Sequence, residues 1–202
     1  MARSEAGRLL TIQHRQRQLQ LRAATLRTLT QLWGLWDGQT IRTFPRFAEP
    51  ATTLVQDRFG TSAGLAVGYY AALRLAEQAG GSPTPRVADP PETDRVIGSL
   101  RATALASTLR GLRAGFSPQA AKQNALVAAM GSAGRMVMRG AAESLVLTSA
   151  ADPRARGWRR VAGSGACDFC EMLAGRGPVY SEDTADFQSH DHCACSAEVV
   201  FS

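Results

Sequence analysis

The stretch from residue 158 to residue 201 reads WRRVAGSGACDFCEMLAGRGPVYSEDTADFQSHDHCACSAEVVF. It contains all four cysteines of the 202-residue chain and two of its three histidines. Cys167-x2-Cys170 is followed, after nineteen residues, by His190-x2-Cys193-x-Cys195. Two short knuckles joined by a loop are typical of a structural tetrahedral metal site, because each knuckle supplies two ligands. We therefore predict a structural zinc ion. The candidate ligands are Cys167, Cys170, His190, His192, Cys193 and Cys195.

Cysteines at this spacing have two other uses. Disulfides would require secretion, but residues 1–30 mix Arg and Gln with Leu and lack the continuous apolar run of a secretory signal. A redox pair usually follows a βαβ pattern, which the sequence does not show here. We therefore favour the metal. The spacing leaves open whether His190 with Cys193, or His192 with Cys195, completes the shell.

The same stretch resembles the C-terminal module of MuF-like phage head-morphogenesis proteins, in the form found among the minor capsid proteins of actinobacterial tailed phages. The shared pattern is Cys-x2-Cys-x2-Leu, a glycine-rich turn with an aromatic residue, and His-x2-Cys-x-Cys. Its positions here are Cys167, Cys170, Leu173, Gly175, Gly177, Tyr180, His190, Cys193 and Cys195. The sequence departs from many members at Asp191 and Ala194, where they carry Pro and Arg.

The resemblance implies a structural component of the virion rather than an enzyme. It implies assembly in the host cytoplasm and a place in the capsid interior near the portal. The expected partners are the portal protein and the major capsid protein, with packaged DNA as a further one. No run of about 18 apolar residues is present, so we expect no membrane-spanning helix and no membrane partner.

The N-terminal region is basic and predicted to be helical. Residues 4–36 carry an apolar residue every seventh position, which predicts one long helix with a partner-facing seam. These apolar residues are Ile12, Leu19, Leu26 and Trp33. From residue 1 to 36 the charge balance is 6 − 1 = +5, whereas from 152 to 202 it is 5 − 8 = −3.

Arginines of this helix, and those next to Trp158, are candidates for contact with nucleic-acid phosphates. They are Arg15, Arg17, Arg22, Arg27, Arg159 and Arg160. Two other interpretations stay open. The helix can present a solvated face to an acidic partner helix, and Trp158 can pack beneath the metal knuckle on an arginine-rich strand. For Trp158 we favour packing.

The remaining pattern predicts a mainly α fold, with long N-terminal helices followed by a small α+β metal-knuckle module. We expect helices over 50–79, from Thr93 to Arg113, and from a cap at Ser117 to about Leu147. Short strands over 158–162 and 197–201 are expected to pair. The predicted regions are 1–82, 92–150 and 151–202, separated first by a Gly- and Pro-rich linker over 80–92. The glycines at 60, 64 and 68 are expected to let helices pack closely.

No catalytic constellation is predicted. The sequence has no phosphate-binding glycine loop with Lys, no His-Glu-x2-His, and no His-x-Glu before its Cys-x2-Cys. One alternative to a structural role is a DNA-binding internal virion protein. The enzymatic alternative is a metal-dependent nuclease centred on His190-Asp191-His192, or a maturation protease. His14 lies far away along the chain, and we expect its replacement by Ala to have no effect.

Overall fold

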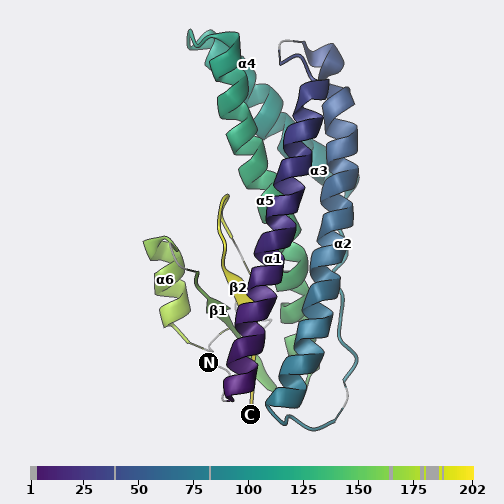
Figure 1. Cartoon of the computed structure of the whole chain (residues 1–202), viewed down its shortest axis with the longest axis vertical. Coiled ribbons are helices and arrows are strands. Elements are labelled where there is room, and N and C mark those ends of the chain that lie inside the picture. Colours follow the sequence, from purple (N-terminus) through teal and green to yellow (C-terminus); the bar gives the residue numbers. More distant parts are fainter. Residues whose placement is uncertain are drawn as a thin grey trace.

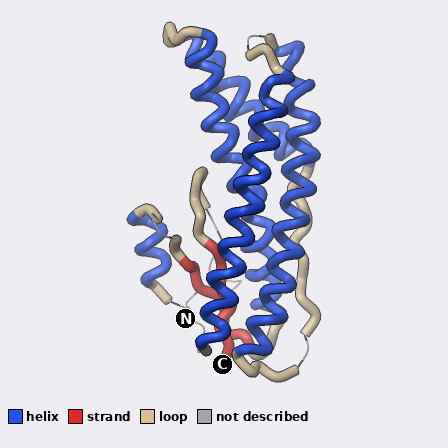
Figure 2. The backbone as a smooth tube through the Cα atoms, viewed as in Figure 1, coloured by secondary structure: helices blue, strands red, loops and turns tan. Residues whose placement is uncertain are grey.

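A computed structural model describes residues 4–38, 40–81, 83–163, 166–177, 180, 187 and 189–202. The chain is mainly helical with one two-stranded sheet, which confirms the predicted fold class (Figures 1 and 2). The elements are α1 (Glu5–Leu32), α2 (Phe44–Ala76), α3 (Thr93–Leu100), α4 (Ala106–Arg113), α5 (Pro118–Ala151), β1 (Ala155–Val161), α6 (Asp168–Gly175) and β2 (Ser196–Phe201). Within the described residues, no helix combines the length and apolar character that crossing a membrane requires.

The three long helices α1, α2 and α5 lie side by side along the long axis of the molecule (Figure 1). Aromatic side chains fill the end of the bundle where α1 turns into α2. The rings of Trp33 and Phe47 meet edge to face with centroids 4.9 Å apart, and Trp36 packs in the same way against Phe44. Such aromatic pairs stabilise the fold beyond the contribution of burial alone, so they strengthen the core at this turn.

The face that α1 turns towards the other helices is largely polar. Its buried residues are Gly7, Thr11, His14, Gln18, Leu21, Thr25 and Leu29. The Gln18 amide donates to the Ser62 carbonyl at 3.0 Å and accepts from the Ser62 hydroxyl at 2.7 Å. That hydroxyl also accepts from the Ala141 N–H at 3.1 Å. One hydrogen-bonded network therefore joins α1, α2 and α5 through Gln18, Ser62 and Ala141.

The apolar seam expected on the first helix lies mostly away from this face. Ile12 is 49% exposed, and Leu19 and Leu26 are half-buried, whereas Trp33 belongs to the core. Hydrophobic periodicity misses the core face because polar side chains occupy it, and Thr11 and Gln18 hydrogen-bond there to α2.

His14 is buried and stacks on Tyr69, with ring centroids 4.3 Å apart. The expectation that His14→Ala has no effect is therefore wrong in structural terms, because the smaller side chain would leave a cavity between α1 and α2. No sequence pattern indicates this burial, since His14 stands among polar residues.

The glycines at 60, 64 and 68 do not pack against another helix. All three are exposed, and the position of an added Cβ has no atom within 4 Å. The close contact occurs instead at Gly140 of α5, where an added Cβ would overlap the carbonyl oxygen of Phe59 in α2. A stripe of small residues permits close approach but does not specify which neighbour uses it.

The segment after α2 runs along α5 in an extended form. The Thr148 hydroxyl accepts from the Arg86 N–H at 2.9 Å and the Ser144 hydroxyl accepts from the Ala88 N–H at 3.0 Å. Ser82, at the end of the first predicted region, lies outside the described residues. Helices from both sides of the segment contribute to one core, where Val96 joins Leu29 and Val55. The division into separate regions stays a prediction.

Helix boundaries near the second half of the bundle follow their sequence signals. A π-helical turn (Arg101–Leu105) connects α3 to α4, so the chain is helical from Thr93 to Arg113 as expected. The Ser117 hydroxyl accepts from the Ala120 N–H and Pro118 starts α5, which confirms the predicted cap. The helix continues four residues beyond the expected end at Leu147, to Ala151.

The two predicted strands pair, which confirms the expected pairing. β1 and β2 are antiparallel, with Trp158 opposite Val199 and Val161 opposite Ser196. Trp158 is buried and stacks on Tyr180 at 4.7 Å between ring centroids, so packing accounts for it. The sheet shares its core with Tyr70 of α2 and Leu145 of α5. The C-terminal module is therefore attached to the lower half of the helix bundle.

Candidate metal centre

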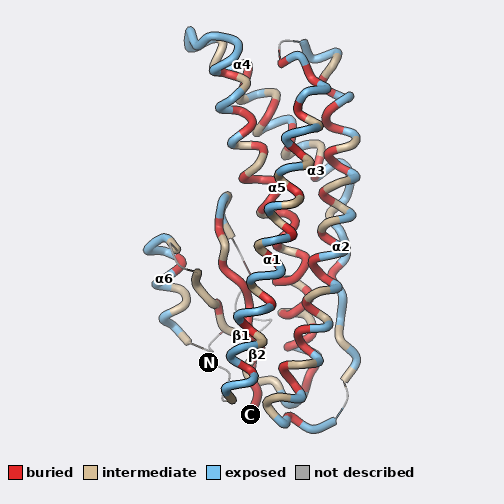
Figure 3. Tube along the Cα trace, in the orientation of Figure 1, coloured by how far each residue is buried: buried red, intermediate tan, exposed pale blue. Residues whose placement is uncertain are grey.

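The pairing of β1 with β2 brings the two knuckles together. Cys167 and Cys170, the first knuckle, lie at the start of α6, which follows β1. Residues His190–Cys195, the second knuckle, lead directly into β2. Val161, the last residue of β1, pairs with Ser196, the first residue of β2. The segment after β1 and the segment before β2 therefore lie at the same end of the sheet, and the two knuckles meet there. Figure 3 shows that buried positions continue from β2 into the preceding segment, while α6 is largely exposed.

Five of the six predicted ligands form one cluster. His190 Nε2 lies 3.1 Å from Cys167 Sγ and 3.5 Å from Cys170 Sγ, and Cys170 Sγ lies 3.6 Å from Cys193 Sγ. The sulfurs of Cys170, Cys193 and Cys195 are within 4.8 Å of one another. In a tetrahedral zinc site with these donors, ligand atoms are about 3.5–3.8 Å apart, as follows from bond lengths of about 2.3 Å to sulfur and 2.0–2.1 Å to nitrogen. The separations that link Cys167, Cys170, His190 and Cys193 are therefore close to those of a zinc site, and Cys170 belongs to both groups of donors.

The imidazole of His190 is oriented for metal binding. Its Nδ1 lies 2.8 Å from the Asp191 carbonyl oxygen. A carbonyl only accepts, so Nδ1 carries the proton and Nε2 presents its lone pair to the thiols. The N–H of Cys195 donates to Cys193 Sγ at 3.4 Å, a hydrogen bond that stabilises a thiolate there.

The surroundings of the four thiols shift their pKa values in opposite directions. A hydrogen bond from the Cys195 thiol lowers the pKa of Cys193 to about 5, and one from the backbone of Cys170 lowers the pKa of Cys167. Burial raises the pKa of Cys170 to about 11, and the hydrogen bond to Cys193 raises that of Cys195. The hydrogen bond to the Asp191 carbonyl raises the pKa of His190. Without a metal, the thiols therefore share protons through hydrogen bonds. A bound cation would replace these shared protons with direct bonds to thiolates.

His192 lies apart from this cluster. Its φ is +66°, and a Cβ added at Gly131 of α5 would lie 2.5 Å from its Nε2. The neighbouring Asp191 forms an ion pair with Arg135 of α5, with 2.7 Å between Nε and Oδ1. The second knuckle is therefore turned so that His190 faces the thiols and His192 faces α5. Spacing alone could not distinguish the two histidines, because the choice depends on this contact with α5.

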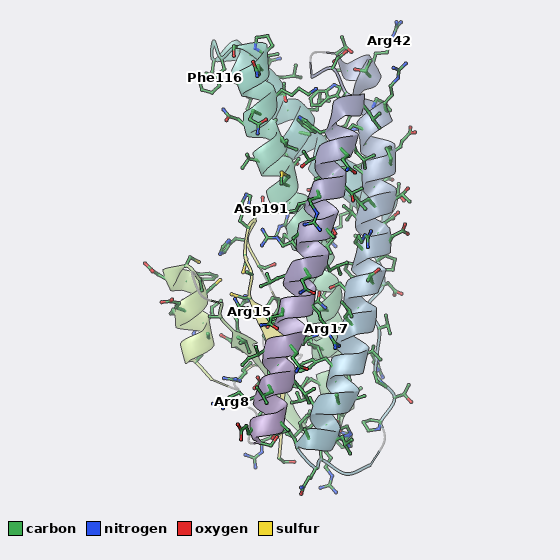
Figure 4. All side chains as sticks on the ribbon, in the orientation of Figure 1. Arg8, Arg15, Arg17, Arg42, Phe116 and Asp191 are labelled. Atoms are coloured by element: carbon green, nitrogen blue, oxygen red, sulfur yellow. The ribbon has the colours of Figure 1, made fainter. Side chains whose placement is uncertain are left out.

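Arginines of α1 hold the other side of the second knuckle. The Arg15 guanidinium donates to the Ala194 carbonyl at 3.4 Å, and that of Arg22 lies 3.5 Å from the carbonyls of His192 and Cys193. Figure 4 shows Arg15 on the side of α1 that faces the C-terminal module, with Asp191 above it. A cavity of about 240 Å³ lies between the knuckles, lined by the cluster, His192, Ala194, Gly163 and Ala166.

Four of the six arginines proposed to bind nucleic acid make contacts within the molecule itself. Besides Arg15 and Arg22, Arg159 forms an ion pair with Glu198 at 2.7 Å, and Arg160 lies over the Phe187 ring at 4.2 Å. Arg17 and Arg27 are exposed. The assignment of these residues to nucleic-acid binding stays a prediction.

Comparison with known proteins adds one finding. No curated protein and no solved structure matches the chain. One family, described as VG15 protein, matches residues 8–202, which includes the helix bundle, the sheet and the candidate metal centre. The chain belongs to the VG15 protein family, a family of phage-associated virion proteins.

Proposed function

We propose that this chain is a structural minor capsid protein of a tailed phage, which acts in head morphogenesis. It lies in the capsid interior next to the portal and joins the portal protein to the major capsid protein. The observation that carries the proposal is the family match, which spans both the long helices and the metal-bearing module. In this role the long helices supply the contact surfaces, and no reaction is needed.

In the proposed role the metal is zinc and its function is structural. Cys167, Cys170, His190 and Cys193 hold it, because the short distances between donor atoms link these four residues. Cys195 supports Cys193 through its backbone N–H. Four protein ligands fill a tetrahedral shell and leave no open position for a substrate. Such an ion fixes the two knuckles, and through them the paired strands, against the helices.

The contacts of the arginines favour this role over a DNA-binding one. A DNA-binding surface needs several cations that can reach phosphates, and binding of that kind weakens steeply with salt. Arg15, Arg22 and Arg159 instead contact carbonyls or a carboxylate of the same chain.

The proposal is tested in the phage that encodes the protein. We expect mass spectrometry to find the chain in purified proheads and mature heads at low copy number. We expect the tagged protein to retain the portal protein of that phage during purification at moderate salt. Retention of DNA with loss of the portal protein would support the DNA-binding alternative. Absence of the chain from proheads and mature heads would overturn the structural role.

A further inference from the structure

The described surface carries two small patches with matching apolar character and opposite charge order. The first is on the outer face of α1, where Leu9 is 50% and Ile12 is 49% exposed. The second is on α6, where Phe169 is 56% and Met172 is 46% exposed. Each patch is a pair of large apolar side chains three residues apart, which places both members on one helix face. We call them the α1 patch and the α6 patch.

The charges around the α1 patch follow the order negative, positive, positive. Glu5 precedes Leu9 and Ile12, and Arg8 and Arg17 border them. Figure 4 shows Arg8 on one side of α1 and Arg17 on the other. All three charged side chains are exposed.

The α6 patch has the complementary order when read from its C-terminal end. Arg176 comes first, followed by Glu171 and Asp168, and all three are exposed. None of the six charged residues of the two patches has an ion-pair partner within the part of the chain that the structure describes. Their charges are therefore available to another molecule.

We propose that the α6 patch of one copy docks on the α1 patch of a second copy, with the two helices antiparallel. In this orientation Arg176 lies near Glu5, and the two acids of α6 lie near Arg8 and Arg17. The apolar pairs meet between these charges. A parallel pairing of two α1 helices would instead bring their arginines together, which like-charge repulsion disfavours.

This contact joins two different surfaces, so each copy keeps one free patch of each kind. Copies therefore add head to tail and form either a closed ring or an open chain. Two pairs of apolar side chains bury less than the roughly 1,200 Å² of a stable interface, so we expect a dissociation constant in the micromolar to millimolar range. The inference does not depend on the proposed function, because it needs only the protein itself.

The test is sedimentation velocity of the full chain from about 1 μM to about 1 mM, the range in which such weak contacts form. We expect the weight-average mass to rise with concentration and to fall when salt screens the charges. Arg8→Glu with Arg17→Glu should keep the protein monomeric, and so should Asp168→Arg with Glu171→Arg. An equimolar mixture of the two variants should associate again, because every α1 patch then finds a complementary α6 patch.

Three controls make the result decisive. Ile12→Asn should weaken association, whereas Leu75→Asn, at a residue 81% exposed on α2 and outside both patches, should not. Because Asp168 and Glu171 are next to metal ligands, zinc content and circular dichroism must match the wild type. If they do not, Glu5→Arg and Arg176→Glu serve as the pair, each weakening association alone and restoring it when mixed.

Several outcomes would overturn the proposal. They are a wild-type protein that stays monomeric at the highest concentration, association that the α1 variant leaves unchanged, and folded variants whose mixture stays monomeric.

Discussion

His14 lies in the bundle as a neutral imidazole. Burial, followed by the charge of Arg17, lowers its pKa from 6.5 to about 4, and its Nε2 has no hydrogen-bond partner among the described residues. We predict that His14→Ala lowers the free energy of unfolding by about 1–3 kcal/mol, through the lost stacking on Tyr69 and the cavity left behind. Urea denaturation at pH 8 measures this. The exposed neighbour Gln13 is the control, and equal effects of Gln13→Ala and His14→Ala would contradict the packing described for His14.

The same residue predicts a pH dependence. Because the folded state lowers the pKa of His14, the unfolded state binds more protons between pH 6.5 and about 4. The stability is therefore complete above pH 6.5 and is lost as the pH falls through this window. The metal ligands also take up protons there, so the measured quantity is the difference between wild type and His14→Leu. We expect the wild type to lose more stability on acidification than the variant; parallel curves would refute the assignment.

The sequence predicted which cysteines and histidines come together but could not distinguish the two histidines; that they bind a metal stays a prediction. All four cysteines and His190 come together because residue type and spacing carry the chemistry of metal binding. The spacing from His192 to Cys195 equals the spacing from His190 to Cys193. Only the direction in which the knuckle turns decides which histidine faces the thiols. That turn depends on Asp191 meeting Arg135, a contact across 56 positions that no local pattern encodes.

At the scale of elements, the contact between α2 and α5 depends on one glycine. A Cβ at Gly140 would overlap the backbone of Phe59, so Gly140→Ala must push the helices apart. We predict a loss of about 1–3 kcal/mol, typical of overpacking. Gly64→Ala is the matched control, because its Cβ would meet nothing within 4 Å. There the higher helix propensity of Ala should stabilise by about 0.5–1 kcal/mol. Thermal unfolding of both variants measures the difference, and a destabilised Gly64→Ala with an unaffected Gly140→Ala would reverse our account.

Element types were predicted more reliably than contact faces. The cap at Ser117 and the paired strands follow from local chemistry, so the sequence was sufficient for them. The inner face of α1 was missed because it contains Gln18 and His14, whose partners come from α2. A polar contact between helices is visible only once both sides are known.

At the scale of the whole molecule, the C-terminal module shares a hydrophobic core with one end of the helix bundle. Trp158 and Val199 pack with Tyr70 and Leu145, whereas the aromatic cluster around Trp33 lies at the other end. Loss of a bound ion is expected to unfold the module, because ion binding that needs the folded site contributes directly to folding. We now predict that chelation also loosens the helix ends next to the module.

Hydrogen exchange with mass spectrometry tests this. In chelator, amides of β1, β2 and the last turns of α5 should exchange at least about tenfold faster, while those around Trp33 and Phe47 should keep their protection. Cys170→Ser should reproduce the pattern without chelator. Uniform loss of protection would mean that the bundle is a single cooperative unit, and unchanged protection would mean that the metal does not hold the module.

The central claim is that Cys167, Cys170, His190 and Cys193 hold one structural zinc ion. X-ray absorption at the zinc edge, on protein purified under reducing conditions, tests it most directly. We predict one zinc per chain with three sulfur neighbours at about 2.3 Å and one nitrogen at about 2.0 Å. Cys195→Ser should retain this shell and Cys193→Ser should lose a sulfur. Protein that binds no zinc, or a shell dominated by oxygen, would contradict the account.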